Sequence, residues 1–436
     1  MDPAVITLLI LIGCIILFLT NWFPSAATAV LGCALFVLTG VCSFSNAFSG
    51  FSSSTTIMVA GMLVIGDAMF QSGLASTLSR VIIKVGASSE RRFITAGILL
   101  SAALSAFMAN MAIIAMFLAI VNTVSKGSEE MHLKRLCMPI AMGAMFGGVC
   151  TLMGSTPQLQ VQNLLEGTCG LSLRPFDYAP VGVILTLAFL AYVHLFWYPL
   201  SRRLWKDADD ADQEQLDSYS ARQAQVEQAI PADQGGLRVD KRFIMAAIMT
   251  LVIVLFITEA VSTAMAAVIG ALLCLVFRCT TEKSVLKNMD WAVLIRLAGC
   301  LGLAAGIGES GCDELIANGL VAVFGSEIHP MVLLVTAVLL AIVISNFISN
   351  STAVIIVLTP VLSLCNRMGF NPIPFGLAVC YGANLAFATP LANAQIGVTM
   401  IAGYQFQDYF KVNVLLELLI ALLVAIFVPM FFPLVA

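Results

Sequence analysis

Hydrophobic residues recur along this chain in long runs that are separated by short polar stretches. Because a helix needs roughly 20 apolar residues to cross a bilayer, most runs have the length of one membrane span. Two runs, 93–125 and 331–366, are too long for one span and carry polar residues at their centres. We predict that each forms a re-entrant hairpin, which enters the membrane and returns to the same face. The complete set of runs is 4–20, 25–44, 54–74, 93–125, 137–165, 180–200, 243–259, 262–277, 291–311, 331–366, 375–404 and 412–433.

Two further runs are interrupted by residues that break helices. The run 137–165 contains Gly154-Ser155-Thr156-Pro157, and the run 375–404 contains Ala388-Thr389-Pro390. Proline lacks a backbone N–H and its ring clashes with the preceding helical turn. We therefore predict a discontinuous helix at each position, with unpaired backbone groups at the break.

The composition agrees with this pattern and excludes other classes of protein. Of the 436 residues, 60% are hydrophobic and 11% are charged, whereas soluble domains have about 45–50% apolar and about 25% charged residues. We predict an all-α polytopic membrane protein, surrounded by the lipid bilayer. The 12 cysteines are scattered singly, which is typical of small apolar side chains in helices. No metal spacing, nucleotide loop or nucleophile–base pair is visible, so we expect no enzyme activity, no cofactor and no nucleic-acid partner.

The basic residues predict the orientation. Most of them fall in four groups, at 80–92, 126–135, 202–242 and 278–287. Lysine and arginine favour the cytoplasmic side of a membrane, and counting the two hairpins as re-entrant places all four groups on one face. We therefore predict a multi-pass protein of the plasma (inner) membrane, with a cytoplasmic linker and both termini outside.

An internal repeat divides the chain at the hydrophilic segment 201–242. Three polar motifs occur in the same order on both sides: Gly61–Gly73 with Gly299–Gly311, Ser105–Asn110 with Ser345–Asn350, and Thr156-Pro157 with Thr389-Pro390. We predict a first repeat at 1–200, a linker at 201–242 and a second repeat at 243–436. Each repeat has five spans and one hairpin. Because five is odd, the second repeat runs opposite to the first, which is the inverted-topology arrangement of many secondary transporters.

The hairpin centres carry neutral polar groups, which suit a small ion or a small polar solute. Asn350 offers an amide oxygen to a cation and an NH₂ group to an anion. Hydroxyl groups of Ser345, Ser349, Ser351 and Thr352 lie beside it in the sequence. Helix N-termini at such a tip also favour anions. The broken helices can supply further carbonyl oxygens from across the site.

These motifs resemble those of a known transporter family. Ser105-Ala-Phe-Met-Ala-Asn110, Ser345-Asn-Phe-Ile-Ser-Asn350, Cys150–Pro157 and Asn384–Asn393 are similar to the hairpin and broken-helix motifs of the divalent anion/sodium symporter family, within the ion transporter superfamily. The resemblance covers nearly the whole chain. It implies a homodimer, a scaffold part, a moving transport part, and two sodium sites that each combine a hairpin tip with the facing helix break.

The resemblance also implies which residues bind the ions and the substrate. The substrate would be a di- or tricarboxylate, or sulfate, held between the two tips. The implied substrate-binding residues are Asn110, Asn350, Ser351, Thr352, Thr156, Pro157, Thr389, Pro390 and Asn393. The implied sodium-binding residues are Ser105, Asn110, Gly154, Ser345, Ser349, Asn350 and Ala388. No other metal is implied.

The sequence departs from the family pattern mainly at the first tip. It reads Ala109-Asn110-Met111 where the family has Ser-Asn-Thr, so two hydroxyl groups are missing. The second tip keeps Ser349-Asn350 and has Ser351 in place of threonine. The second break has Ala392-Asn393-Ala394 where the family sequence is usually rich in proline. The sequence therefore predicts an asymmetric site, in which the second tip has more oxygen ligands.

Three functional hypotheses remain open at this stage. The first is sodium-coupled uptake of a small anion. The second is a proton-linked or exporting carrier of the same superfamily, for citrate or an arsenite-like oxyanion. Proton coupling would use an intramembrane acid or histidine, and Asp67, in the middle of the third run, is either that group or a structural hydrogen-bonded acid. A membrane-embedded enzyme or a channel is disfavoured. The other candidate groups for proton coupling are Glu259, Glu309, Asp313, Glu314 and His194.

Overall fold

The computed structural model describes residues 2–20, 22–73, 89–126, 131–205, 240–258, 260–312, 328–390 and 394–435. Within these residues the regular structure is helical, apart from one isolated β-bridge between Phe370 and Val435. This confirms the predicted all-α class. Most of the predicted linker lies outside the described residues, as do Glu259, Asp313, Glu314 and Asn393.

The first half of the chain contains two groups of helices. The first group is α1 (Pro3–Thr20), α2 (Ser25–Leu38), α3 (Phe44–Ala47), the 3₁₀ turn η1 (Ser49–Ser52) and α4 (Ser54–Gln71). The second group is α6 (Glu90–Ser105), α7 (Asn110–Lys126), α8 (Leu133–Gly148), α9 (Thr156–Cys169), α10 (Ala179–Tyr192), the π-helical turn η2 (Val193–Trp197) and α11 (Tyr198–Leu204).

The second half of the chain contains the remaining described helices. It begins with α13 (Lys241–Thr258), α14 (Thr263–Val276), α15 (Glu282–Asn288) and α16 (Trp291–Ser310). It continues with α18 (Pro330–Ser345), α19 (Asn350–Met368), α20 (Pro372–Asn384), α21 (Ala394–Gly397), the 3₁₀ turn η3 (Val398–Ala402) and α22 (Phe406–Phe431). The helices α8 and α20 therefore end where the sequence predicts breaks.

Apolar helices of membrane-spanning length occur in both halves. Among the described residues, the segments long and apolar enough to cross a membrane are Ala179–Leu204, Lys241–Thr258, Trp291–Ser310, Asn350–Met368 and Phe406–Phe431. The two overlong hydrophobic runs form the helix pairs α6–α7 and α18–α19, each joined by a tight turn. Because α19 has the length of a full span, the re-entrant course of these pairs stays a prediction.

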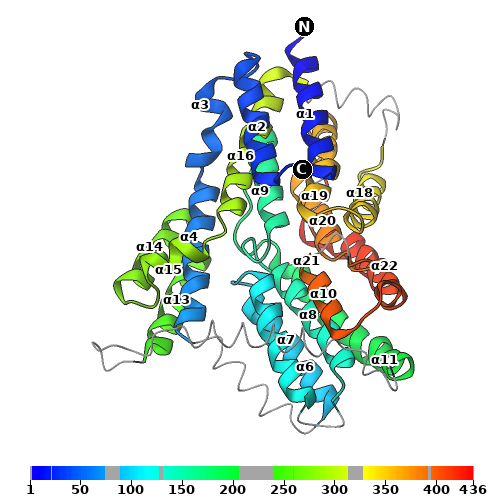
Figure 1. Ribbon diagram of the computed structural model, residues 1–436. Coiled ribbons are helices and arrows are strands. Elements are labelled where there is room, and N and C mark those ends of the chain that lie inside the picture. Colours follow the sequence, from blue (N-terminus) through cyan, green and yellow to red (C-terminus); the bar gives the residue numbers. More distant parts are fainter. Residues whose placement is uncertain are drawn as a thin grey trace.

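The helices gather into groups that meet at α9. Helix α4 packs on α14, and α16 packs on α2. Gly61 allows the first contact, because a Cβ atom there would lie 2.8 Å from the Ala267 backbone. On the other side, α6 and α7 pack on α8, and α18 and α19 pack on α20. Helix α9 contacts α16, α19 and α20 and lies near the centre of the molecule (Figure 1).

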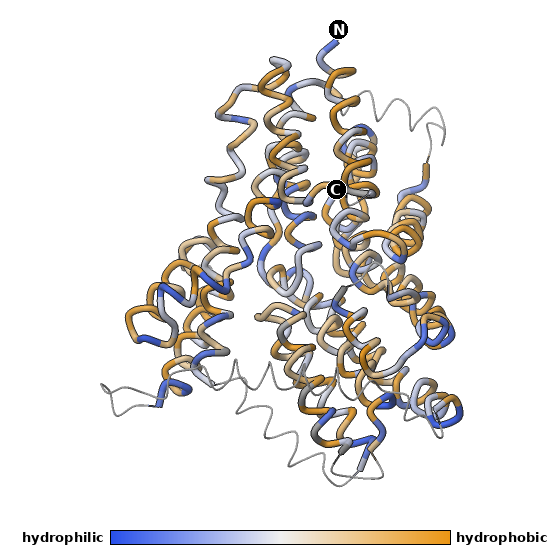
Figure 2. The backbone as a smooth tube through the Cα atoms, in the orientation of Figure 1, coloured by the Kyte–Doolittle hydropathy of each residue, from blue (hydrophilic) through white to orange (hydrophobic). Residues whose placement is uncertain are grey.

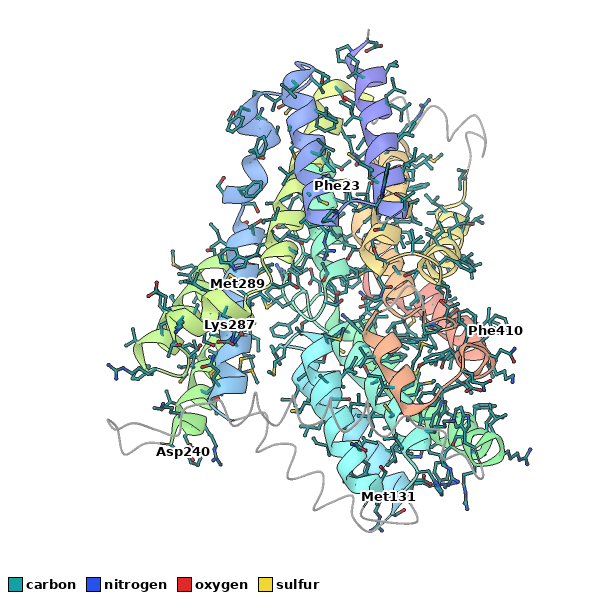
Figure 3. The ribbon with its side chains drawn as sticks, in the orientation of Figure 1. Phe23, Met131, Asp240, Lys287, Met289 and Phe410 are labelled. Carbon is teal, nitrogen blue, oxygen red and sulfur yellow. The ribbon has the colours of Figure 1, made fainter. Side chains whose placement is uncertain are left out.

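The outer surface is largely apolar, as expected for contact with lipid. Hydrophobic residues run along the long helices (Figure 2). Many of their side chains are exposed, and examples are Leu9, Leu187 and Leu418. Phe410 on α22 is 58% exposed and points away from the helices (Figure 3). Extensive exposed apolar surface marks a site of contact with a membrane or another protein. On helices of membrane-spanning length, we attribute it to contact with the bilayer.

Candidate functional site

The first hairpin tip places a serine and an asparagine against each other. Helix α6 ends at Ser105 and α7 begins at Asn110, and both side chains are buried. The Ser105 hydroxyl donates to Asn110 Oδ1. Asn110 Nδ2 donates to Met145 Sδ at 3.4 Å and to Gln395 Oε1 at 3.2 Å. The first tip is therefore linked to α8 and, through Gln395, to the second half of the chain.

The first helix break lies between Gly148 and Thr156 and faces this tip. The Thr151 hydroxyl donates to the carbonyl of Ala106 in the tip. Gln158 Nε2 donates to the Gly148 carbonyl at 2.7 Å, which satisfies one carbonyl freed by the end of α8. Gly154 lies directly against Gly148, and a Cβ atom at Gly154 would overlap the Gly148 carbonyl. The break therefore requires glycine at position 154 for steric reasons.

The second hairpin tip repeats the serine–asparagine pair. Helix α18 ends at Ser345 and α19 begins at Asn350. The Ser345 hydroxyl lies 3.0 Å from Asn350 Oδ1 and 2.7 Å from the Ala383 carbonyl, as donor to both. Ser349 caps α19, because its Oγ accepts from the Thr352 N–H and lies 2.7 Å from Thr352 Oγ1. Ser351 is buried in the first turn of α19.

The second break, after Asn384, is tied to its tip in the same way as the first. The Thr389 hydroxyl donates to the Asn346 carbonyl, and the Thr389 N–H donates to Asn346 Oδ1 at 3.1 Å. The corresponding bond in the first half comes from Thr151, so Thr151, and not Thr156, is the hydrogen-bonding counterpart of Thr389. Thr156 instead begins α9 and is partly exposed. Thr156 and Thr389, which align in the sequence, therefore do not make equivalent contacts with the two tips.

The two breaks meet at the centre of the molecule. The Ser155 hydroxyl donates to Asn384 Oδ1 at 3.0 Å, and Asn384 Nδ2 donates to Gln158 Oε1 at 3.1 Å. All three side chains are buried. Pro157 and Pro390 are buried as well. The structure thus brings the predicted site residues that it describes to two adjoining tip–break pairs, which offer neutral oxygens to cations and amide or backbone N–H groups to anions.

Glu417 is a site residue that the sequence analysis missed. It lies on α22 with 6% of its surface exposed. Its Oε1 accepts from the Phe387 N–H at 2.5 Å and the Ala388 N–H at 2.6 Å. Asn346 Nδ2 donates to both carboxylate oxygens, at 3.1 Å and 3.0 Å. Glu417 therefore joins the second tip to the second break. The sequence signal was a single acidic residue within the last apolar run, 412–433.

Among the described residues, the groups that donate to the Glu417 carboxyl are neutral. Among the described helices, α10, α18 and α20 pack on α22, and these three contain no lysine or arginine. In the first half, the group at the break is the neutral Thr186 of α10, which lies 3.7 Å from Cys150 and donates to the Phe146 carbonyl at 3.2 Å. The second tip–break pair therefore contains a buried carboxyl group, whereas the contact described for the first pair comes from a hydroxyl group.

Asp67 belongs to a different part of the protein. Its carboxylate accepts from Thr280 at 2.6 Å, Asn288 at 2.8 Å and Ser284 at 3.2 Å. Gln71, one turn further along α4, also donates to it at 2.8 Å. These bonds fasten the short helix α15 to α4. These contacts agree with the interpretation of Asp67 as a structural hydrogen-bonded acid, and the proton-coupling interpretation stays a hypothesis.

Comparisons with known proteins agree with the resemblance in the motifs. The family model described as "Citrate transporter" matches residues 15–357 and 309–434. The uncharacterized transporter YfbS of Escherichia coli (strain K12) is 21% identical, over 92% of this chain and 94% of that protein. The sodium-dependent dicarboxylate transporter SdcS of Staphylococcus saprophyticus is 20% identical, over 89% of this chain and 78% of the relative.

A solved structure shares the fold. The YdaH transporter of Alcanivorax borkumensis superposes with a TM-score of 0.57 at 14% identity, covering 99% of this chain and 98% of that one. The predicted resemblance to the divalent anion/sodium symporters is confirmed by the sodium-dependent dicarboxylate relatives. These families consist of membrane transporters and not of enzymes. The chain therefore belongs to the citrate transporter family, and it is a multi-pass membrane transporter.

Proposed function

We propose that this protein is a secondary active transporter that moves a small anion together with sodium. The substrate class is a carboxylate, such as a di- or tricarboxylate, or sulfate. The observation that supports this most directly is the pair of adjoining tip–break sites, with Glu417 fixed beside the second one. Neutral oxygens of this kind suit sodium, and amide groups at helix N-termini suit an anion.

The arrangement also gives a physical reason why sodium binding would be coupled to anion binding. A carboxylate substrate would enter a region that already contains the buried Glu417 carboxyl, which adds a second negative charge when it is ionised. Like charges in a poorly solvated region repel each other strongly, so bound cations would lower the cost of binding the anion. Ser345, Ser349, Asn350 and the carbonyl of Ala388 are the proposed cation ligands in the second half. Ser105, Asn110 and the carbonyl of Gly154 are the proposed ligands in the first half.

The proposal includes the wider arrangement implied by the motifs. The anion would lie between the tips, near Asn110, Asn350 and the first turns of α7, α9 and α19. Transport would proceed by alternating access, in which a part carrying the tips moves relative to a scaffold part. Two inverted repeats, a homodimer, a cytoplasmic linker and external termini belong to the same proposal.

The proposal is tested by a thermal-shift panel on the purified protein. Citrate, dicarboxylates, sulfate and oxyanions are each added with sodium chloride or with potassium chloride at equal ionic strength. A ligand that binds the folded state raises the melting temperature by mass action. We expect a carboxylate or sulfate to stabilise the protein in sodium and much less in potassium. Equal stabilisation in both salts would refute sodium coupling, and no stabilisation by any anion would refute the substrate class.

The second candidate is a proton-linked or exporting carrier of citrate or an oxyanion. The observation that favours it is Glu417, because buried acids inside membrane proteins often belong to proton pathways. Uptake and efflux by the protein in liposomes separate the candidates. A proton-linked carrier would respond to an imposed pH gradient in the absence of sodium and would lose that response in Glu417→Gln. A sodium-coupled carrier would respond to a sodium gradient at constant pH.

A further inference from the structure

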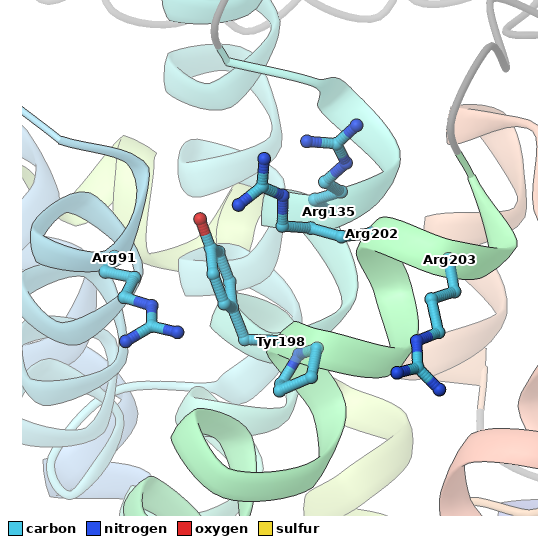
Figure 4. Close-up of a pocket in the computed structure, with 6 residues that line it drawn as sticks. Arg91, Arg135, Tyr198, Arg202 and Arg203 are labelled. Atoms are coloured by element: carbon cyan, nitrogen blue, oxygen red, sulfur yellow. The ribbon is translucent and has the colours of Figure 1, made fainter.

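A cavity rich in arginine lies where α6, α8 and α11 come together. Its volume is about 390 Å³, and the residues that line it are Arg91, Arg135, Tyr198, Pro199, Arg202 and Arg203. Arg91, Arg135 and Arg202 lie around Tyr198 in the close-up, and Arg203 stands further along α11 (Figure 4). The cavity is separate from the hairpin tips and from Glu417. Nothing in the transport proposal uses it.

The cavity carries an excess of positive charge. Arg135 is 7% exposed and lies 3.6 Å from Glu90, which also accepts from the Tyr198 hydroxyl at 3.0 Å. Arg135 also donates to the Trp205 carbonyl at 3.2 Å, which fixes its guanidinium. Glu90 offsets one of the four guanidinium charges. The arginines at 91, 202 and 203 are exposed and have no acidic partner in the described part of the chain.

Two of these arginines are held in place by the tyrosine. The Arg91 guanidinium lies 4.5 Å from the centre of the Tyr198 ring, and that of Arg202 lies 6.0 Å from it. Contacts of this kind orient a guanidinium without using its N–H donors. Those donors therefore remain directed at the cavity, and a planar set of N–H groups matches the oxygens of a phosphate group.

The surroundings of the cavity indicate where its ligand comes from. Leu195 and Phe196, one turn before Tyr198, are 69% and 54% exposed. They belong to the apolar segment Ala179–Leu204, which has the length of a membrane span. The arginines thus stand at the end of an apolar outer surface, where the acyl chains of a lipid would meet its headgroup. Free phosphate would gain nothing from this apolar neighbour.

We propose that this cavity, lined by Arg91, Arg135, Arg202 and Arg203 around Tyr198, binds the phosphate headgroup of an anionic phospholipid. The acyl chains would lie along Leu195 and Phe196. Basic residues near a membrane surface attract anionic lipids, and basic pockets between helices bind their headgroups. This site would fix the end of α11 against α6 and α8 at the membrane surface.

The experiment is native mass spectrometry of the full-length protein with added lipid. Retention of phosphatidylglycerol is compared with that of phosphatidylcholine having the same acyl chains. The test variant is the double substitution Arg202→Gln and Arg203→Gln. The matched control is Lys283→Gln with Lys287→Gln, which removes two exposed charges from α15. Circular dichroism shows that each variant is folded. Inorganic phosphate is added in a separate arm.

We expect the wild type and the lysine control to retain phosphatidylglycerol in preference to phosphatidylcholine. The arginine variant should bind phosphatidylglycerol about tenfold or more weakly, because each lost basic residue weakens the attraction. Equal retention of the two lipids by the wild type would overturn the proposal, as would equal loss in the two variants. If inorganic phosphate displaces the lipid at millimolar concentration, the site is one for soluble phosphate, which overturns the assignment to lipid.

Discussion

The substitution of Glu417 tests how the second helix break is held. Its carboxylate accepts from the Phe387 and Ala388 N–H groups and from Asn346 Nδ2. Glu417→Gln removes the charge but keeps one oxygen for the two backbone N–H groups. Glu417→Ala removes the charge and every acceptor. Because both variants lack the carboxyl group, the difference between their stabilities reports the donors that are left unpaired together with the side-chain volume that alanine removes.

The structure sets the expected size of this difference. A buried donor without an acceptor costs about 1–3 kcal/mol. Two backbone N–H groups lose their acceptor in the alanine variant and keep it in the glutamine variant. The free energy of unfolding should therefore be at least about 2 kcal/mol lower for Glu417→Ala than for Glu417→Gln. This corresponds to about a 30-fold change in the ratio of folded to unfolded protein.

The assay is reversible unfolding of purified protein by SDS in mixed micelles, followed by circular dichroism. Glu166 supplies a matched control, because it is a partly buried acid on α9 whose donors, Thr55 and Gln162, are side chains. Such side chains can turn to other acceptors, and hydrogen bonds of this kind in membranes contribute about 0.6 kcal/mol each. The alanine and glutamine variants of Glu166 should therefore differ little. Equal stability of the two Glu417 variants would refute the role given to its carboxylate.

Five further substitutions test the tips and the scaffold. Gly148→Ala should reduce uptake by roughly tenfold or more, because overpacking costs about 1–3 kcal/mol and the new Cβ would lie 2.5 Å from Asn110 Oδ1. Gly66 has open space around it, so Gly66→Ala should leave uptake unchanged. Equal uptake rates in Gly148→Ala and Gly66→Ala would contradict the predicted clash with Asn110. Asn350→Ala should abolish uptake by folded protein, with Asn110→Ala nearly as damaging; wild-type rates in liposomes would reject the assignment of the tips. Asp67→Asn should retain uptake, because its hydroxyl and amide partners on α15 can still bond an amide; loss of uptake with an unchanged circular dichroism spectrum would assign Asp67 a transport role.

The sequence alone was sufficient to predict the class of the protein and the positions of the polar residues that interrupt its apolar runs. Apolar runs of membrane-spanning length arise because hydrocarbon excludes unpaired polar groups. The same rule makes polar residues inside such runs conspicuous, and for this reason Ser105, Asn110, Ser345 and Asn350 stand out in the amino-acid sequence. The proline and glycine breaks are visible there too, because these residues act on the local backbone.

The tertiary structure decided which of these residues meet. The Thr151 hydroxyl donates to the first tip, a contact that the aligned Thr-Pro dipeptides do not reveal, because hydrogen bonding depends on where the broken chain turns. Glu417 was overlooked because one acid in an apolar run does not reveal its partners, which lie 29, 30 and 71 residues away along the chain. The local pattern of apolar and polar residues indicates whether lipid or water surrounds a segment. Long-range contacts depend instead on how segments that are distant in the sequence pack together. That packing places the Glu417 carboxyl at the second tip–break pair.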